Sequence, residues 1–218
     1  IMKDVYILSI ETSCDETSIA IVKNGHDVIV YGRDENQVKE LNEKHQNTTY
    51  FPAEIVFSNK IKATTNLKES LENAEIVVVS VPSIAIRSVL SSIKPFLKNK
   101  PIFINTAKGF DMNSKKRLSE VFEEVLGDSM KGMVSLIGPS LALEVAKRHL
   151  TCICAVSYSL EDSNLVAELF SNDYFRVYTG DDVVGSEIGV AIKNPIAICS
   201  GILMGLGLGD NARAALMT

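Results

Sequence analysis

The sequence has little cysteine, no secretory leader pattern and no apolar run long enough to cross a membrane. Its four cysteines, Cys14, Cys152, Cys154 and Cys199, form no Cys-x-x-Cys pair, which excludes a disulfide-rich secreted scaffold and favours reduced thiols. The longest apolar run, residues 196–208, is shorter than the ~20 residues that a spanning helix needs. We therefore expect a soluble, cytoplasmic protein without membrane insertion.

A surplus of positive charge is also missing. The formal net charge is −5, there is no run of Lys or Arg, and the aromatic residues are not interleaved with basic ones, which argues against a nucleic-acid binder. The three histidines, His26, His45 and His149, are scattered, so we predict no metal site. With 46% hydrophobic residues, the 218-residue chain can bury a substantial core in one or two domains.

Short apolar runs alternate with amphipathic segments along most of the chain. The runs, several of them β-branched throughout, predict strands covered on both faces. They are Val5–Ile10, Val28–Tyr31, Ile76–Val81, Ile102–Asn105, Met133–Ile137, Thr151–Val156 and Arg176–Tyr178. The segments between them predict helices over Glu35–Lys44, Ile84–Leu97, Ser114–Leu126, Leu141–Lys147 and Ser163–Phe170. This alternation indicates an α/β fold with a Rossmann-like, doubly wound, mostly parallel sheet.

The pattern changes near Gly185, where strands give way to one long Ala-, Gly- and Ile-rich helical region. We therefore predict a dinucleotide-binding domain over residues 1–184 and the start of an all-helical substrate domain over residues 185–218.

Two lysines are candidates for chemistry. Lys193 lies inside the apolar helical region, where an ammonium group is costly to bury unless it has a partner or a reaction. A lysine whose stem covers apolar surface is the structural alternative. Lys108 follows the strand Ile102–Asn105, at the sheet edge where doubly wound folds bind ligands. Two lysines meeting at one crevice suit an anionic carbonyl substrate, since one holds charge while the other transfers a proton.

The turn Gly138–Ser140 follows the strand Met133–Ile137 and precedes a predicted helix. Backbone N–H groups at a helix N-terminus bind phosphate, although Ser140 could equally act as an N-cap. Val81–Ser83 occupies the corresponding place after another strand, and either lines a dinucleotide or forms an ordinary turn.

Arg33 comes directly after the strand Val28–Tyr31. An acidic residue at this edge usually holds the ribose hydroxyls of NAD, whereas an arginine suits the 2′-phosphate of NADP. The alternative is a solvated turn arginine.

From about Asn24 to Thr218 the chain resembles the bacterial NAD(P)-dependent glycerol-3-phosphate dehydrogenases. The resemblance is carried by segments in matching order, namely Tyr31–Asp34, Ile61–Thr65, Val81–Ser83, Thr106–Gly109, Gly138–Ser140, Phe175–Tyr178, Lys193–Asn194 and Gly207–Arg213. It implies reversible reduction of dihydroxyacetone phosphate to glycerol 3-phosphate with NAD(P)H, which supplies the backbone of glycerophospholipids.

The same resemblance implies roles for single residues. Lys193 and Lys108 would be catalytic, Lys193 as the proton donor and acceptor at the substrate carbonyl. Lys108, Gly138, Ser140 and Lys193 would bind the substrate, and Arg33, Lys108 and Ala142 the cofactor. Members of the family dimerise, which predicts a homodimer.

The first strand is followed by an unusual turn. In the family register, the three glycines of Gly-x-Gly-x-x-Gly fall on Ser9, Glu11 and Cys14. Glycines allow the backbone to approach the pyrophosphate, and Glu11 adds a negative charge beside it. One like-charge pair at ~4 Å costs about 4 kcal/mol at an effective dielectric of 20, so we expect weak cofactor binding or none.

Residues 1–24 instead resemble the opening of the tRNA threonylcarbamoyladenosine transferases, through Ile7–Val22. This resemblance predicts a chimera of two families, with a nucleotide-binding transferase relative and a non-catalytic Rossmann fragment as alternative functions. Ser13–Glu16 reads as a capping box that favours a helix after the first strand, whereas Thr17, Ile19 and Ile21 favour a strand.

The family's further substrate-phosphate ligands lie beyond Thr218 in its alignment. We therefore expect the chain to hold part of a substrate pocket and to expose apolar helix faces, which predicts self-association.

Overall fold

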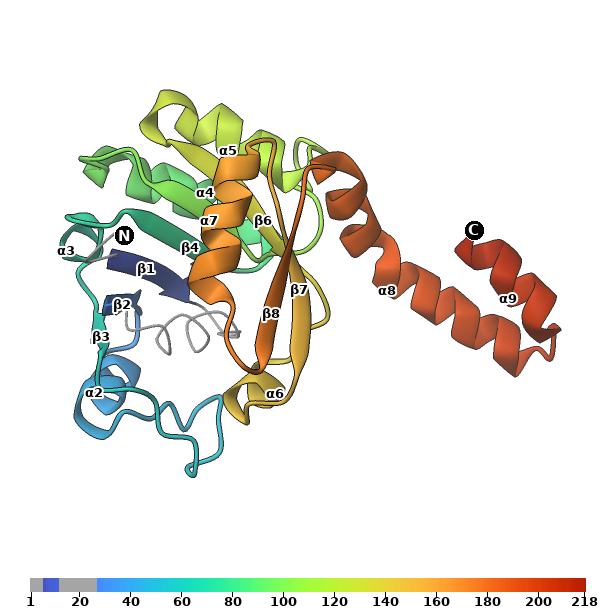
Figure 1. Ribbon diagram of the computed structural model, residues 1–218, viewed down its shortest axis with the longest axis horizontal. Coiled ribbons are helices and arrows are strands. Elements are labelled where there is room, and N and C mark those ends of the chain that lie inside the picture. Colours follow the sequence, from blue (N-terminus) through green and yellow to red (C-terminus); the bar gives the residue numbers. More distant parts are fainter. Residues whose placement is uncertain (1–5, 12–26) are drawn as a thin grey trace.

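A single mixed β-sheet forms the centre of the computed structural model, which describes residues 6–11 and 27–218 (Figure 1). Its strands lie in the order β3-β2-β1-β4-β5-β6-β7-β8. They are β1 (Tyr6–Glu11), β2 (Asp27–Tyr31), β3 (Ile61–Thr64), β4 (Ile76–Ser80), β5 (Ile102–Asn105), β6 (Gly132–Ile137), β7 (Thr151–Val156) and β8 (Phe175–Gly180). Neighbours are parallel except β6 and β7, which are antiparallel. The predicted Rossmann-like, mostly parallel sheet is confirmed.

The central strand β4 shows why its sequence is apolar throughout. All five of its residues are buried. Ile76 and Val78 pack into the core on one face, while Val77 and Val79 pack into the core on the other. A strand covered on both faces cannot alternate apolar with polar residues, and the run of β-branched residues reflects this.

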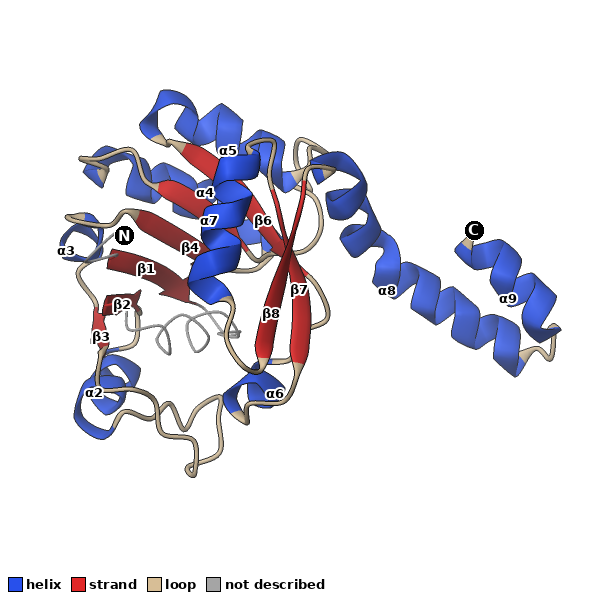
Figure 2. Cartoon of the chain, viewed as in Figure 1, coloured by secondary structure: helices blue, strands red, loops and turns tan. Residues whose placement is uncertain are grey.

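Helices cover both faces of the sheet (Figure 2). One layer contains α3 (Leu67–Leu71), α4 (Ser83–Ile93) and α5 (Leu118–Leu126), whose apolar residues share a core with Phe103. The other contains α2 (Glu35–Lys44), α6 (Ala142–Ala146) and α7 (Leu160–Phe170), which pack with Ile104. Short 3₁₀ turns, η1 (Lys94–Phe96) and η2 (Gly127–Ser129), follow α4 and α5.

Some local expectations need correction. The strand β3 and the helix α3 were not predicted, because β3 is a short edge strand in which only Ile61 is buried. Helix α4 ends at Ile93, and the residues after it form the 3₁₀ turn. The choice between helix and strand after Ser13 falls outside the described residues.

The predicted helix start at Ser114 is wrong, since α5 begins at Leu118. Residues 111–116 form a tight turn in which the Lys115 N–H donates to the Asp111 carbonyl at 2.8 Å. Lys115 has a φ of 59°, which a helix cannot contain. Glu120 accepts a hydrogen bond from the Arg117 N–H at 2.8 Å, so the helix is capped three residues later than predicted.

The C-terminal region forms two helices, α8 (Val183–Gly205) and α9 (Gly209–Met217), which project from the sheet as a hairpin (Figure 1). The predicted helical region is divided into two helices at Gly207, whose φ of 70° turns the chain. By length and composition, α8 could cross a membrane: its most apolar window has a mean hydropathy of 1.5 and none of it is buried. Length and composition alone do not distinguish a helix that spans a membrane from a helix that packs against other protein.

Candidate functional site

The candidate site lies at the carboxyl edge of the parallel strands. The segments that follow β2, β4, β5 and β6 emerge there, carrying Gly32–Asp34, Val81–Ser83, Thr106–Gly109 and Gly138–Ser140. The strand order changes direction between β1 and β4, and the crevice at such a point binds ligands in doubly wound folds. The fold thus brings four of the predicted segments to one edge.

The turn that carries Lys108 is held by the end of β5. The buried Asn105 accepts a hydrogen bond from the Ala107 N–H at 3.0 Å and donates to the Ala107 carbonyl at 3.2 Å. Gly109 has a φ of 122°, and a Cβ there would lie 3.3 Å from the Ser83 hydroxyl. The turn therefore packs closely against the start of α4 and leaves the Lys108 side chain exposed.

An ionic network also holds the loop that carries Lys108. The Arg87 guanidinium on α4 donates to Asp111 at 3.1 Å and to Glu124 on α5 at 3.1 Å. Hydrogen bonds from Arg87 and Lys116 lower the pKa of Glu124 to about 2. Hydrogen bonds from Ser114 and Arg87 outweigh burial and lower the pKa of Asp111. The loop after β5 is thereby fastened to two helices.

Gly138 has a packing reason to be glycine. A Cβ at this position would lie 2.8 Å from the Cα of Ile153, where β6 runs antiparallel to β7. Ser140 is half-buried and lies one residue before Leu141, which holds the N-cap position of α6. The N-cap position considered for Ser140 thus falls on Leu141.

Arg33 extends from the turn between β2 and α2. Its neighbour Asp34 caps α2 by accepting hydrogen bonds from the N–H groups of Asn36 at 2.8 Å and Gln37 at 3.3 Å. Arg33 is exposed, and no residue in the described part of the chain pairs with it. The Arg33 guanidinium thus lies beside a capped helix start, and its N–H groups have no hydrogen-bond acceptor among the described residues.

Lys193 lies midway along α8 and is exposed. Burial of its ammonium, which the apolar helical pattern suggested, is not seen, because α8 leaves the sheet after its first turns (Figure 1). No contact between Lys193 and Lys108 is present among the described residues. The meeting of the two lysines stays a prediction.

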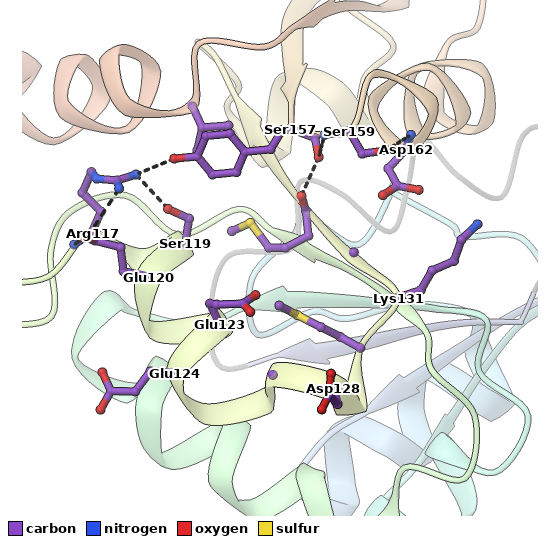
Figure 3. Close-up of a pocket in the computed structure, with 16 residues that line it drawn as sticks. Arg117, Ser119, Glu120, Glu123, Glu124, Asp128, Lys131, Ser157, Ser159 and Asp162 are labelled. Carbon is purple, nitrogen blue, oxygen red and sulfur yellow. Dashed lines mark hydrogen bonds and ion pairs between the residues drawn. The ribbon is translucent and has the colours of Figure 1, made fainter.

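A buried carboxylate that the sequence analysis missed fastens α8 to the sheet. Glu187 is 4% exposed. It accepts hydrogen bonds from the Ser119 N–H at 3.0 Å, the Ser119 hydroxyl at 2.6 Å and the Ser135 hydroxyl at 3.1 Å. Arg117 forms an ion pair with it at 3.1 Å and also donates to Ser119 and Tyr158 (Figure 3). Burial opposes the charge of Arg117, but its hydrogen bond to Tyr158 and its acidic neighbours raise its pKa.

Glu187 shares the signal that drew attention to Lys193, a charge within an apolar helical run. Its partners come from α5 and β6, and no sequence spacing relates these elements to α8.

Two family models match the chain. The model described as NAD-dependent glycerol-3-phosphate dehydrogenase N-terminus matches residues 17–163, and the model for the C-terminus of the same enzyme matches residues 182–218. The chain belongs to the NAD-dependent glycerol-3-phosphate dehydrogenase family. The resemblance predicted from the sequence is confirmed, and the Rossmann-like sheet is the N-terminal part of this family's fold.

Curated relatives agree with this assignment. A glycerol-3-phosphate dehydrogenase (NAD(P)+) of Enterococcus faecalis is 47% identical over 91% of this chain and 58% of its own length. The enzyme of the same name from Bacillus subtilis is 41% identical over 100% of this chain and 63% of its own. The chain therefore spans about three fifths of the length of these relatives.

Solved structures of the family superimpose on most of the chain. The crystal structure of glycerol-3-phosphate dehydrogenase from Coxiella burnetii is 32% identical, with a TM-score of 0.85 over 98% of this chain and 65% of that one. The Saccharomyces cerevisiae enzyme is 27% identical, with a TM-score of 0.85.

The first strand, β1, carries two of the residues that replace glycines of the family register. Ser9 and Glu11, which take glycine positions of the family register, both lie in β1, and Glu11 is its last residue. Glu11 pairs in register with Ser80 at the end of β4, so its backbone lies at the crevice. Cys14, the third position, lies outside the described residues.

Proposed function

We propose that this chain acts in the reversible, NAD(P)-dependent interconversion of glycerol 3-phosphate and dihydroxyacetone phosphate. The observation that carries this proposal is the match of both family models, and it is supported by Thr106–Gly109 and Gly138–Ser140, which follow the adjacent parallel strands β5 and β6. The curated relatives are named glycerol-3-phosphate dehydrogenase, and this chain covers about three fifths of their length.

NADP or NAD is the proposed cofactor, bound over the crevice between β1 and β4. Arg33 fits this role, because it is exposed beside the end of β2 and its donors suit a 2′-phosphate. Lys108 and Ala142 would contact the same molecule. Glu11 opposes it, since its place in the family register adds a negative charge beside the pyrophosphate. Binding is therefore proposed to be weak.

Lys193 is proposed to pass a proton to and from the substrate oxygen, while the bound nicotinamide supplies the hydride. Lys108, Gly138 and Ser140 are proposed to hold the phosphate-bearing substrate, with Lys108 also catalytic. The dinucleotide-binding domain would extend over residues 1–184 and the substrate domain would begin at residue 185. No metal is required in this scheme.

The reaction would provide the glycerol phosphate backbone of phospholipids in the cytoplasm, and the active form would be a homodimer without nucleic acid. We propose no membrane insertion for α8. Its first turns are held by Arg117 and Ser135 through the buried Glu187, and charged groups in a spanning segment are costly.

A second candidate function concerns the first 24 residues. Their resemblance to the tRNA threonylcarbamoyladenosine transferases is what supports a chimera, whereas the Bacillus subtilis dehydrogenase aligns with the whole chain. In that case this segment would favour ATP over a nicotinamide nucleotide.

Calorimetric titration of the chain with NADPH, NADH and ATP tests the cofactor. Arg33→Ala should weaken NADPH binding at least tenfold and leave NADH unchanged, because only NADPH carries the 2′-phosphate. Lys100→Ala, at the opposite edge of the sheet, is the matched control. Binding of ATP alone would replace the dehydrogenase proposal by the second candidate.

Dihydroxyacetone-phosphate-dependent oxidation of NADPH tests the chemistry. Lys193→Ala should lower kcat by about 10²–10⁴-fold while NADPH binding is retained, since general acid–base groups contribute that much. Equal activity of Lys193→Ala and Lys100→Ala would refute the role of Lys193.

A further inference from the structure

A cavity lies at the edge of the sheet opposite the candidate site. It has a volume of about 660 Å³ and is bounded by α5, the start of β6 and the segment that joins β7 to α7 (Figure 3). Because β7 is antiparallel to β6, the end of β7 and the start of β6 lie side by side. The cavity is thus at the amino edge of the parallel strands and is large enough for a small molecule.

Asp162 is the mostly buried carboxylate of this cavity, and its side chain has no partner among the described residues. It is 5% exposed, on the first turn of α7, and its carboxylate lies against Gly132, whose missing side chain makes room for it. Its backbone N–H donates to the Ser159 hydroxyl at 3.2 Å. Within residues 27–218 nothing pairs with the carboxylate itself, which reaches the cavity wall.

A mostly buried carboxylate without a partner is a candidate to bind a cationic group. Asp162 is mostly buried, its carboxylate oxygens open onto the cavity, and they accept no hydrogen bond from the described residues. The N-terminus of α7 stabilises its charge in part through the helix dipole, but the nearest N–H groups are directed to other acceptors. The carboxylate is left able to accept hydrogen bonds from a ligand.

The rest of the cavity is acidic as well. Glu120 and Glu124 are already paired with basic side chains. Glu123 and Asp128 have no ion pair among the described residues. Of the basic side chains on the wall, Arg117 is paired with Glu120 and Glu187, which leaves Lys131 to balance the acidic groups in part. Met130, Met133 and Tyr158 add apolar surface between these charges. The lining therefore suits a molecule with an aliphatic body and more than one positive charge.

We propose that this cavity binds a small aliphatic diamine or polyamine, with one primary ammonium group on Asp162. An ammonium presents three donors, and its second charge would lie towards Glu123 and Asp128. An organic cation is favoured over a metal ion, because no group of three metal-ligating side chains converges anywhere in the described part of the chain. This site is independent of the dehydrogenase proposal.

The test is calorimetric titration of the full chain with spermidine and putrescine at 0.15 M salt. Asp162→Asn should weaken binding at least tenfold. Glu161→Gln, which removes the same charge from the exposed neighbouring residue, should leave it unchanged. Circular dichroism and thermal melting show whether Asp162→Asn is folded.

A second variant keeps the test valid if Asp162→Asn is unstable. Glu123→Gln with Asp128→Asn alters only exposed residues and should weaken spermidine more than putrescine, since spermidine carries the extra charge. Non-saturable binding, equal affinity in Asp162→Asn and Glu161→Gln, or Mg²⁺ binding that depends on Asp162 in place of amine binding would each overturn the proposal.

Discussion

At the residue scale, Glu187 shows how a carboxylate can be buried when hydrogen-bond donors surround it. Glu187 receives three hydrogen bonds and an ion pair from α5 and β6, which together satisfy both carboxylate oxygens. Two of the donors belong to Ser119, at the positive end of α5. The residue joins the first turns of α8 to the sheet, at the start of the family's C-terminal region.

Glu187→Gln should destabilise the fold by about 3 kcal/mol, since it leaves Arg117 without its buried partner and directs an amide donor at other donors. Urea denaturation followed by circular dichroism measures the change. Glu168→Gln, an exposed position on α7, is the control and should stay within about 0.5 kcal/mol of the parent. Equal stability of the two variants would mean that Glu187 does not anchor α8.

At the scale of elements, the loop between β5 and α5 is positioned by charge. Arg87 connects Asp111 in the loop to Glu124 on α5, and Lys116 adds a second ion pair to Glu124. The turn with Lys108 belongs to the same loop. Its position therefore depends on ionised carboxylates.

This network predicts a dependence of stability on pH. The pKa of Glu124 falls from 4.5 to about 2 on folding, so its contribution is fully present above pH 4.5 and is lost as the pH falls through 2. Glu124→Gln should therefore be less stable than the parent near neutral pH, and the difference should vanish by about pH 2. Thermal melting across this range is the measurement.

The adjacent Glu123→Gln provides the control for this pH dependence. Glu123 has no ion pair in the described part of the chain, so its removal should produce no comparable difference. A gap between the parent and Glu124→Gln that stays constant down to pH 2 would contradict the network's role.

At the scale of the whole molecule, the hairpin of α8 and α9 presents an uncovered apolar surface. Ile198 is 65% exposed and Ile202 is 55% exposed, and similar residues continue along both helices. Exposed apolar patches of this kind mark interfaces in soluble proteins. The hairpin is thus the part of the chain most prone to contact another molecule.

We expect the chain to self-associate through this hairpin. Sedimentation equilibrium should show an average mass that rises with concentration, and Ile198→Glu with Ile202→Glu should restore a monomer by placing charges on the surface. Ile84→Glu, at a 74% exposed position on α4, should leave association unchanged. Association that persists in the double variant would place the interface elsewhere.

The sequence alone determined most of the strands and most of the helices. Strands covered on both faces, such as β4, must be apolar throughout, and helices such as α2 carry their own capping residues, so local patterns suffice. Family membership was also readable, because motifs such as Thr106–Gly109 keep their order.

Tertiary structure decided what the charges do. Glu187, Asp162 and Arg87 acquire their roles from partners, or from the lack of them, on elements distant in sequence. The same holds for β3, which pairs only because β2 offers an edge, and for Gly138, which is required by the approach of β7. Burial and long-range contacts depend on how elements pack, and local sequence patterns do not encode them.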